Sequence, residues 1–185
     1  ARPGQTIRTI MRPPLFVPGT REVEDVLADM RRLKTHLAIV LDEYGGTAGP
    51  GITEEIIGRW FARGGERRAR TVLATKLYNS MKGFGRTDNW PNTTHLSALN
   101  IRESCDASLR RLQTGHIDIY QMHHIDRGTP FDEIWEAFSV LRQQGKVTYF
   151  GSSNFAGWHL AQAQEAARSR GMLGLVSEQS LYNLR

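Results

Sequence analysis

The chain has 185 residues, of which 39% are hydrophobic and 23% are charged, and its formal net charge is +5. This composition is typical of a globular protein with a buried core and excludes wholesale disorder. No stretch approaches the roughly 18 apolar residues of a membrane-spanning helix, and the first residues lack the apolar segment of a signal peptide. The single cysteine, Cys105, excludes an internal disulfide framework. We therefore expect a soluble, cytoplasmic protein without a membrane partner.

The positive charge does not indicate a nucleic-acid partner. The densest basic segment, residues 63–70 (RGGERRAR), lies between a helical pattern and a strand pattern, and no aromatic residues are interleaved with it. Arginine also far outnumbers lysine, a skew that codon usage explains better than phosphate contact. We interpret this segment as a solvated connection and expect no nucleic-acid binding.

The first fifty residues predict a strand, a helix, a second strand and a loop. Residues 7–17 are apolar but interrupted by two prolines, which favours an edge strand. Thr20 can cap a helix, and residues 36–42 form a nearly continuous apolar run that is typical of a strand covered on both faces. Residues 45–51 are the richest loop signal in the chain. The apolar stripe of the predicted helix is Val23, Val26, Leu27, Met30 and Leu33.

From residue 53 onward, helix and strand patterns alternate. Gly115 and Gly145 are predicted to end two of the helices. Each helix leads from one strand to the next, which is the rhythm of βαβ units with parallel pairing. The sequence therefore predicts an α/β fold with about six strands. Strands are predicted over 71–77, 117–122, 147–152 and 175–179. Helices are predicted to begin at Thr53, Ser97, Thr129 and Ala156.

Two segments resemble known families. Residues 53–185 resemble the aldo/keto reductases through EEIIGRWFARGG, VLATKLY, SLRRLQTGHIDIYQMHHID, GKVTYFGSSNF and GLVSEQSLYNL. Residues 7–49 resemble the CBS domain of CorC-type, hemolysin-like proteins through TIRTIMRPPLFVPGT, DVLADMRRLKTHLAIV and DEYGGTAG, and both families fit residues 44–58. We interpret the chain as a chimera, with a CBS-like unit over 1–50 and half of a (β/α)₈ barrel over 51–185, folded as one unit.

The reductase resemblance implies NADP(H)-dependent reduction of a small carbonyl compound. In this family a hydride moves to the carbonyl carbon, a tyrosine protonates the oxygen, and a lysine lowers the pKa of that tyrosine. The resemblance assigns Lys76 as the catalytic lysine and His123 as the histidine that orients the carbonyl. It also implies that three residues hold the carboxamide of the cofactor: Ser153, Asn154 and Gln179.

Without the resemblance, the same residues have plainer interpretations. Lys76 would be the exposed end of a strand, and Ser153-Asn154 would be a helix cap. His123 and His124 would be a hydrogen-bonded core pair, because no acidic or cysteine partner at ligand spacing indicates a metal.

The resemblance also implies residues that the chain does not supply at the family's spacing. The family's aspartate and tyrosine would precede the helix at Thr53, where CBS-like sequence stands, and the last two barrel strands would follow Arg185. Tyr44 is the candidate substitute for the tyrosine, with Asp42 nearby, although its spacing to Glu54 is longer than in the family. Our hypothesis is that Tyr44 reaches the site.

Three functions remain open at this point. The first is the inherited reductase chemistry, weak or silent as the chain stands. The second is a recombined or engineered folding scaffold without evolved activity, and the third is a CBS-type module that binds adenosine nucleotides. Six strands cannot close an eight-stranded barrel, so we expect an open sheet or a homo-oligomer.

Overall fold

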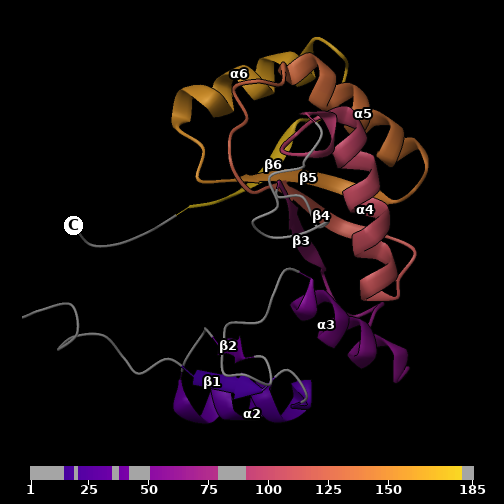
Figure 1. Ribbon diagram of the computed structural model, residues 1–185, viewed down its shortest axis with the longest axis vertical. Coiled ribbons are helices and arrows are strands. Elements are labelled where there is room, and N and C mark those ends of the chain that lie inside the picture. Colours follow the sequence, from indigo (N-terminus) through magenta and orange to yellow (C-terminus); the bar gives the residue numbers. More distant parts are fainter. Residues whose placement is uncertain (1–14, 19–20, 35–37, 42–50, 79–90, 181–185) are drawn as a thin grey trace, which may run out of the picture.

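The computed structural model describes residues 15–18, 21–34, 38–41, 51–78 and 91–180, in which helices and strands alternate (Figure 1). This alternation confirms the predicted α/β class. The elements in chain order are β1 (Leu15–Pro18), α2 (Val23–Leu33), β2 (Ala38–Leu41), α3 (Ile52–Ala62), β3 (Ala74–Leu77), a 3₁₀ turn η1 (Pro91–Thr93), α4 (Ala98–Leu112), β4 (Ile117–Met122), α5 (Phe131–Gln143), β5 (Val147–Ser153), α6 (Gly157–Arg168) and β6 (Leu175–Gln179).

The strands form two parallel sheets. One sheet has four strands in the order β3-β4-β5-β6, and the other pairs β1 with β2. The parallel pairing was predicted, but the division into two sheets was not. Among the described strands, β3 pairs only with β4 and β6 only with β5, so the four-stranded sheet is open. It corresponds to part of a (β/α)₈ barrel.

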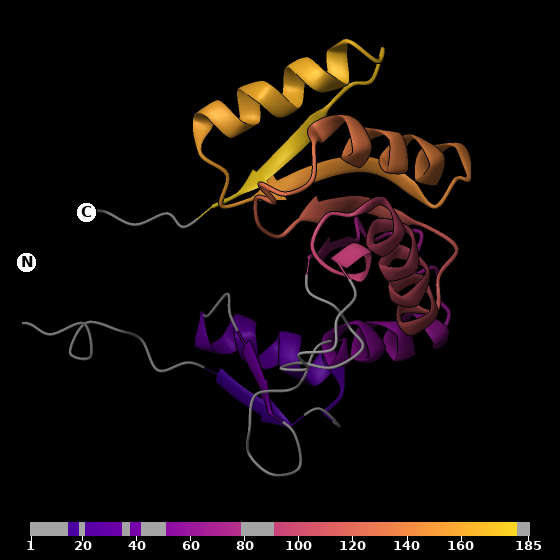
Figure 2. The same ribbon diagram turned by 45° about the horizontal axis from the view of Figure 1, so that its top comes forward.

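Helices α4, α5 and α6 cover one face of the four-stranded sheet (Figure 2). Phe138 of α5 stacks on Phe150 of β5, with ring centroids 4.2 Å apart, and Trp135 meets both rings edge-on. The indole of Trp135 donates a hydrogen bond of 2.9 Å to the carbonyl of Ala163 in α6. This core holds the strands on the face covered by the helices. The carboxyl ends of the strands are not part of these contacts.

The helix starts differ from the sequence predictions in two places. Ser97 caps α4 as predicted, because its hydroxyl accepts a hydrogen bond from the amide of Asn100. Thr53 lies inside α3, and the cap position is Gly51 with φ 92°, a left-handed conformation that glycine adopts readily. Thr129 is not the cap either, because the cap position of α5 is Pro130, and the Thr129 hydroxyl donates to the Asp126 carboxylate at 2.6 Å.

Two other boundaries also test the predictions. Helix α4 ends at Leu112, earlier than the predicted end at Gly115, because Gln113 takes the left-handed cap conformation with φ 51° and its amide donates to the last turn. Gly145 does follow α5 with φ 69°, as predicted. Strand β3 is shorter than predicted, because the amide of Leu73 donates to the Asp118 side chain instead of extending the ladder.

Helix α3 packs tightly against the end of α4 at Gly58. A Cβ added at Gly58 would lie 2.1 Å from the carbonyl oxygen of Arg111, so only glycine permits this approach. The contact places the first turn of α3 beside β3, where the candidate site lies.

The β1-α2-β2 unit is much less buried. No residue of α2 is buried, and Leu27 and Leu33 of the predicted apolar stripe are 39% and 48% exposed. The unit contacts α3 through Glu24, whose carboxylate accepts hydrogen bonds from Trp60 at 2.9 Å and from Arg63 at 3.1 Å. The stripe is only partly covered because a two-stranded sheet offers too little surface to cover it. Within the described segments, no helix is long and apolar enough to span a membrane.

Candidate active site

The predicted site residues lie at the carboxyl ends of neighbouring parallel strands. Lys76 is in β3, His123 directly follows β4, Ser153 ends β5 and Gln179 ends β6. Because all four strands run in the same direction, these ends meet at one edge of the sheet. The register places Lys76 opposite Gln121.

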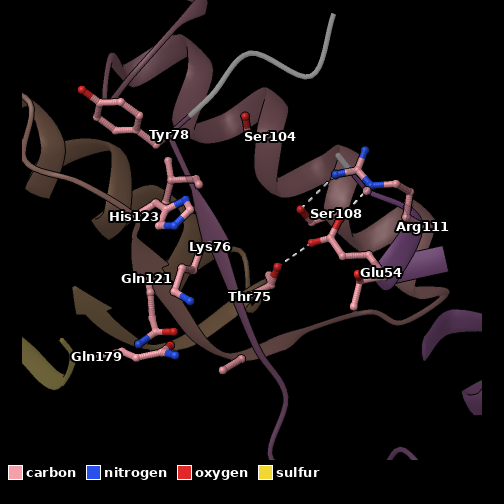
Figure 3. Close-up of a pocket in the computed structure, with 14 residues that line it drawn as sticks. Glu54, Thr75, Lys76, Tyr78, Ser104, Ser108, Arg111, Gln121, His123 and Gln179 are labelled. Carbon is pink, nitrogen blue, oxygen red and sulfur yellow. Dashed lines mark hydrogen bonds and ion pairs between the residues drawn. The ribbon is translucent and has the colours of Figure 1, made fainter. Parts of the chain in front are cut away.

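A cavity of about 450 Å³ opens along β3 (Figure 3). Lys76, His123 and Gln179 line one part of it, and Glu54 and Arg111 line another. The structure therefore brings together three of the residues assigned by resemblance. Ser153 and Asn154 are not part of the cavity wall and lie beyond it at the end of β5.

His123 is half-buried and held in place by its backbone, whose amide donates to the carbonyl of Leu77 at 2.9 Å. Burial lowers the pKa of His123, and the neighbouring His124 and Lys76 lower it further. The imidazole is therefore neutral at neutral pH and can offer a hydrogen bond to a carbonyl oxygen. The rings of His123 and His124 stack at 4.5 Å, which corrects the expectation of a hydrogen-bonded pair.

Lys76 extends from β3 into the cavity next to His123 (Figure 3). In the part of the chain that the structure describes, no carboxylate forms an ion pair with its ammonium group. Its charge is thus available to a group that enters the cavity. This differs from the plainer interpretation of Lys76 as an exposed strand end, since the residue is half-buried.

A buried ion pair next to Lys76 was missed by the sequence analysis. The Glu54 carboxylate accepts hydrogen bonds from the hydroxyl of Thr75 at 2.5 Å and from Nε of Arg111 at 2.7 Å. The side chains of Glu54 and Arg111 are only 13% and 19% exposed. The pair joins α3 and α4 to the residue before Lys76. No local spacing signals it, because the two charged residues are far apart in the sequence.

Ser153 and Asn154 form a turn that is anchored to the end of β6. The Ser153 hydroxyl donates to the carbonyl of Gln179 at 2.8 Å, and the amide of Asn154 donates to the same oxygen at 3.2 Å. Ser153 is buried, whereas Asn154 and Gln179 are exposed. The pair is not a helix cap, because the cap position of α6 is Ala156. The Ser153 hydroxyl bonds to the next strand instead.

Glu178 is a second residue that the sequence analysis missed. Its carboxylate accepts hydrogen bonds from the Ser152 hydroxyl, the Phe155 amide at 3.0 Å and the Ser180 hydroxyl at 2.5 Å. Burial raises the pKa of Glu178, but these hydrogen bonds outweigh burial and leave the pKa below its usual value. Glu178 is therefore ionised at neutral pH.

Two tyrosines, Tyr44 and Tyr78, are candidates for the proton donor of the site. Tyr44 and Asp42 lie outside the described residues, so the hypothesis that Tyr44 reaches the site stays a prediction. Tyr78 does line the cavity, but its hydroxyl is directed away from Lys76 (Figure 3) and lies 3.4 Å from the carbonyl of Ile125. Burial and the nearby Asp126 raise the pKa of Tyr78, which is unfavourable for a proton donor. Among the residues with described positions, no cluster could hold a metal ion.

Comparison with known proteins identifies the family. The aldo/keto reductase profile matches residues 41–185, a range that starts before the boundary we placed at 51 and includes Tyr44. An uncharacterized oxidoreductase, YrpG, of Bacillus subtilis is 54% identical over 142 residues, which cover 76% of this chain and 43% of the relative. Versiconal hemiacetal acetate reductase of Aspergillus parasiticus is 33% identical over 145 residues, covering 72% of this chain and 42% of the relative.

A third relative is named as a channel subunit and not as a reductase. A putative voltage-gated potassium channel subunit beta of Schizosaccharomyces pombe is 32% identical over 133 residues, covering 72% of this chain and 37% of the relative. The chain thus spans less than half the length of these three relatives. The extent of the profile match, together with the strand-end residues in the cavity, shows that the chain belongs to the aldo/keto reductase family.

Proposed function

We propose that the protein contributes the carbonyl-binding side of an NADP(H)-dependent reductase of aldehydes or ketones. The observation that carries this proposal is the position of His123 beside Lys76 in one cavity, and the lowered pKa of His123 favours its neutral form. In this role His123 donates a hydrogen bond to the carbonyl oxygen and orients the substrate. Lys76 stabilises the negative charge that develops on that oxygen during reduction.

The end of β6 and the turn after β5 fit a nicotinamide carboxamide. The side-chain amides of Asn154 and Gln179 both donate and accept hydrogen bonds, as recognition of a carboxamide requires. Beside them Gly151 lets Ser177 of β6 pack closely against β5, because an added Cβ would lie 2.3 Å from Oγ of Ser177. We assign Ser153, Asn154 and Gln179 to this subsite. When bound there, NADPH supplies a hydride.

We propose Tyr44 as the proton donor, with its phenol pKa lowered by Lys76. Its longer spacing to α3 leads us to expect slow turnover. Tyr44→Phe should then abolish the carbonyl reduction of the wild type. An unchanged rate in Tyr44→Phe would remove this residue from the mechanism.

The test is NADPH consumption with a reactive aromatic aldehyde, followed by absorbance on the purified chain. We expect slow turnover that disappears in Lys76→Met. Lys146→Met is the matched control, because Lys146 pairs with Asp106 at 2.7 Å and does not line the cavity. No turnover by the wild type at high protein concentration would overturn the reductase proposal and favour the scaffold without activity.

The chimera and its CBS-type nucleotide site also stay proposals. The unit β1-α2-β2 has parallel strands joined by a helix, as a CBS-derived fragment would. A rise in the melting temperature with ATP or AMP would support a nucleotide site. An unchanged melting temperature would contradict it.

The homo-oligomer that we expected is a separate proposal. The helices cover only one face of the four-stranded sheet, and Tyr149 of β5 is 46% exposed. Association of two copies would cover more of this surface. Light scattering that showed only monomers at several concentrations would contradict it.

A further inference from the structure

Glu178 binds the residues on both sides of the Ser153-Asn154 turn. Its carboxylate accepts a hydrogen bond from the Ser152 hydroxyl on one side and from the Phe155 amide, at 3.0 Å, on the other. Ser152 is fully buried and Phe155 is 7% exposed, whereas Glu178 itself is exposed, so both hydrogen bonds are partly buried. One carboxylate therefore spans the turn.

Asn154 in this turn has φ 58°. The left-handed conformation is uncommon for residues other than glycine, although asparagine adopts it more readily than most, and the surrounding contacts hold the turn in it. The remaining contacts to the turn come from the residue after Glu178, since the carbonyl of Gln179 accepts bonds from Ser153 and Asn154. The last two residues of β6 thus hold the whole turn.

We propose that Glu178 is a positioning residue that fixes the Ser153-Asn154 turn in the conformation required for the carboxamide subsite. Its effect on the cofactor rests on the proposed function, whereas its effect on the turn does not. An ionised carboxylate suits this position because it accepts several hydrogen bonds and makes charge-assisted bonds of more than ordinary strength. It also places a negative charge near the start of α6, which has no side-chain cap.

The experiment compares wild-type protein with Glu178→Ala and Glu178→Gln, all as full chains. Glu165→Gln is the matched control, because Glu165 lies exposed on α6 and pairs only with Arg168 among the described residues. Hydrogen exchange of the segment 150–158, measured without ligand, should be roughly tenfold faster in Glu178→Ala. Glu178→Gln keeps one acceptor oxygen and should show a smaller increase, and Glu165→Gln should show none.

The second readout is NADPH affinity, measured by fluorescence titration, together with the KM for the aldehyde. We expect Glu178→Ala to weaken NADPH binding roughly tenfold and to leave the aldehyde KM nearly unchanged. Glu178→Gln should restore part of the affinity. Faster exchange with unchanged NADPH affinity would overturn the positioning role and leave only a structural one.

The two readouts separate this proposal from the proposed function. If the wild type binds no NADPH, the reductase proposal fails, and hydrogen exchange alone decides whether Glu178 fixes the turn. Exchange of segment 150–158 that stays at the wild-type rate in both Glu178 variants would overturn the proposal outright. If Glu178→Ala fails to fold, the same comparison is made with Glu178→Gln.

Discussion

Residues 15–41 and residues 52–179 have the same strand-helix-strand pattern but very different burial. In the second region Trp135, Tyr120 and Phe138 are fully buried between the helices and the sheet. In the first region no residue of α2 is buried. A parallel sheet is stable when helices cover it and the strands are numerous enough to cover the helices in return. An amphipathic pattern therefore predicts a helix but not how deeply that helix is buried.

The candidate site belongs to the well-packed region. Lys76 and His123 are carried by β3 and by the end of β4, which the core of α4 and α5 holds from the other face. Two polar groups complete the support: the Glu54–Arg111 pair beside β3 and Glu178 at the end of β6. A site that needs fixed distances between side chains requires such rigid support.

The largest expected difference between the two regions is in the free energy of unfolding that is lost when an apolar side chain is truncated to alanine. Trp135→Ala removes ring contacts with Phe138 and Phe150 and the hydrogen bond to Ala163, and should lower the free energy of unfolding by about 3–5 kcal/mol. Leu33→Ala in α2 should cost less than about 0.5 kcal/mol, because Leu33 is 48% exposed. Urea unfolding measures both. Equal losses in the two variants would contradict the comparison.

A smaller effect is expected where α3 meets α4. Gly58→Ala places a methyl group against the carbonyl oxygen of Arg111 and should destabilise the chain by about 1–3 kcal/mol. Gly157→Ala is the matched control, because a Cβ at Gly157 meets no atom within 4 Å. Thermal unfolding of both variants measures the difference in their stability. If Gly58→Ala were as stable as Gly157→Ala, the close approach of α3 to α4 would be wrong.

The smallest effect concerns the charge state of His123. Its folded pKa lies below the ordinary value of 6.5, so the unfolded chain binds this proton more readily. The stability that His123 contributes is thus present above pH 6.5 and is lost as the pH falls through its lower folded pKa. An NMR titration of the imidazole measures this pKa, which should rise in Lys76→Met. A wild-type pKa at or above 6.5 would contradict the half-buried position of His123 beside Lys76.

The sequence predicted the second region well because its signals are local. The cap at Ser97, the turn at Gly145 and the strands of the four-stranded sheet follow from neighbouring residues. The cap at Thr53 was wrong because Gly51, two residues earlier, occupies the cap position in a left-handed conformation. Neighbouring residues could not show that conformation.

Long-range contacts account for the rest. Nothing near Glu54 points to Arg111, and nothing near Glu178 points to Ser152 and Phe155. Likewise, strand pairing depends on segments that are distant in sequence, so one sheet of about six strands could not be distinguished from two separate sheets. The family resemblance located Lys76 and His123 but not the side chains that hold them in place.

The most direct test of the account is hydride transfer itself. NADPH with deuterium at its transferable position is incubated with an aromatic aldehyde and a stoichiometric amount of the full chain, and the alcohol is analysed by mass spectrometry. We expect alcohol with deuterium on the former carbonyl carbon from the wild type and none from Lys76→Met. Absence of deuterated alcohol from the wild type, or its equal formation by Lys76→Met, would contradict the proposed reductase function.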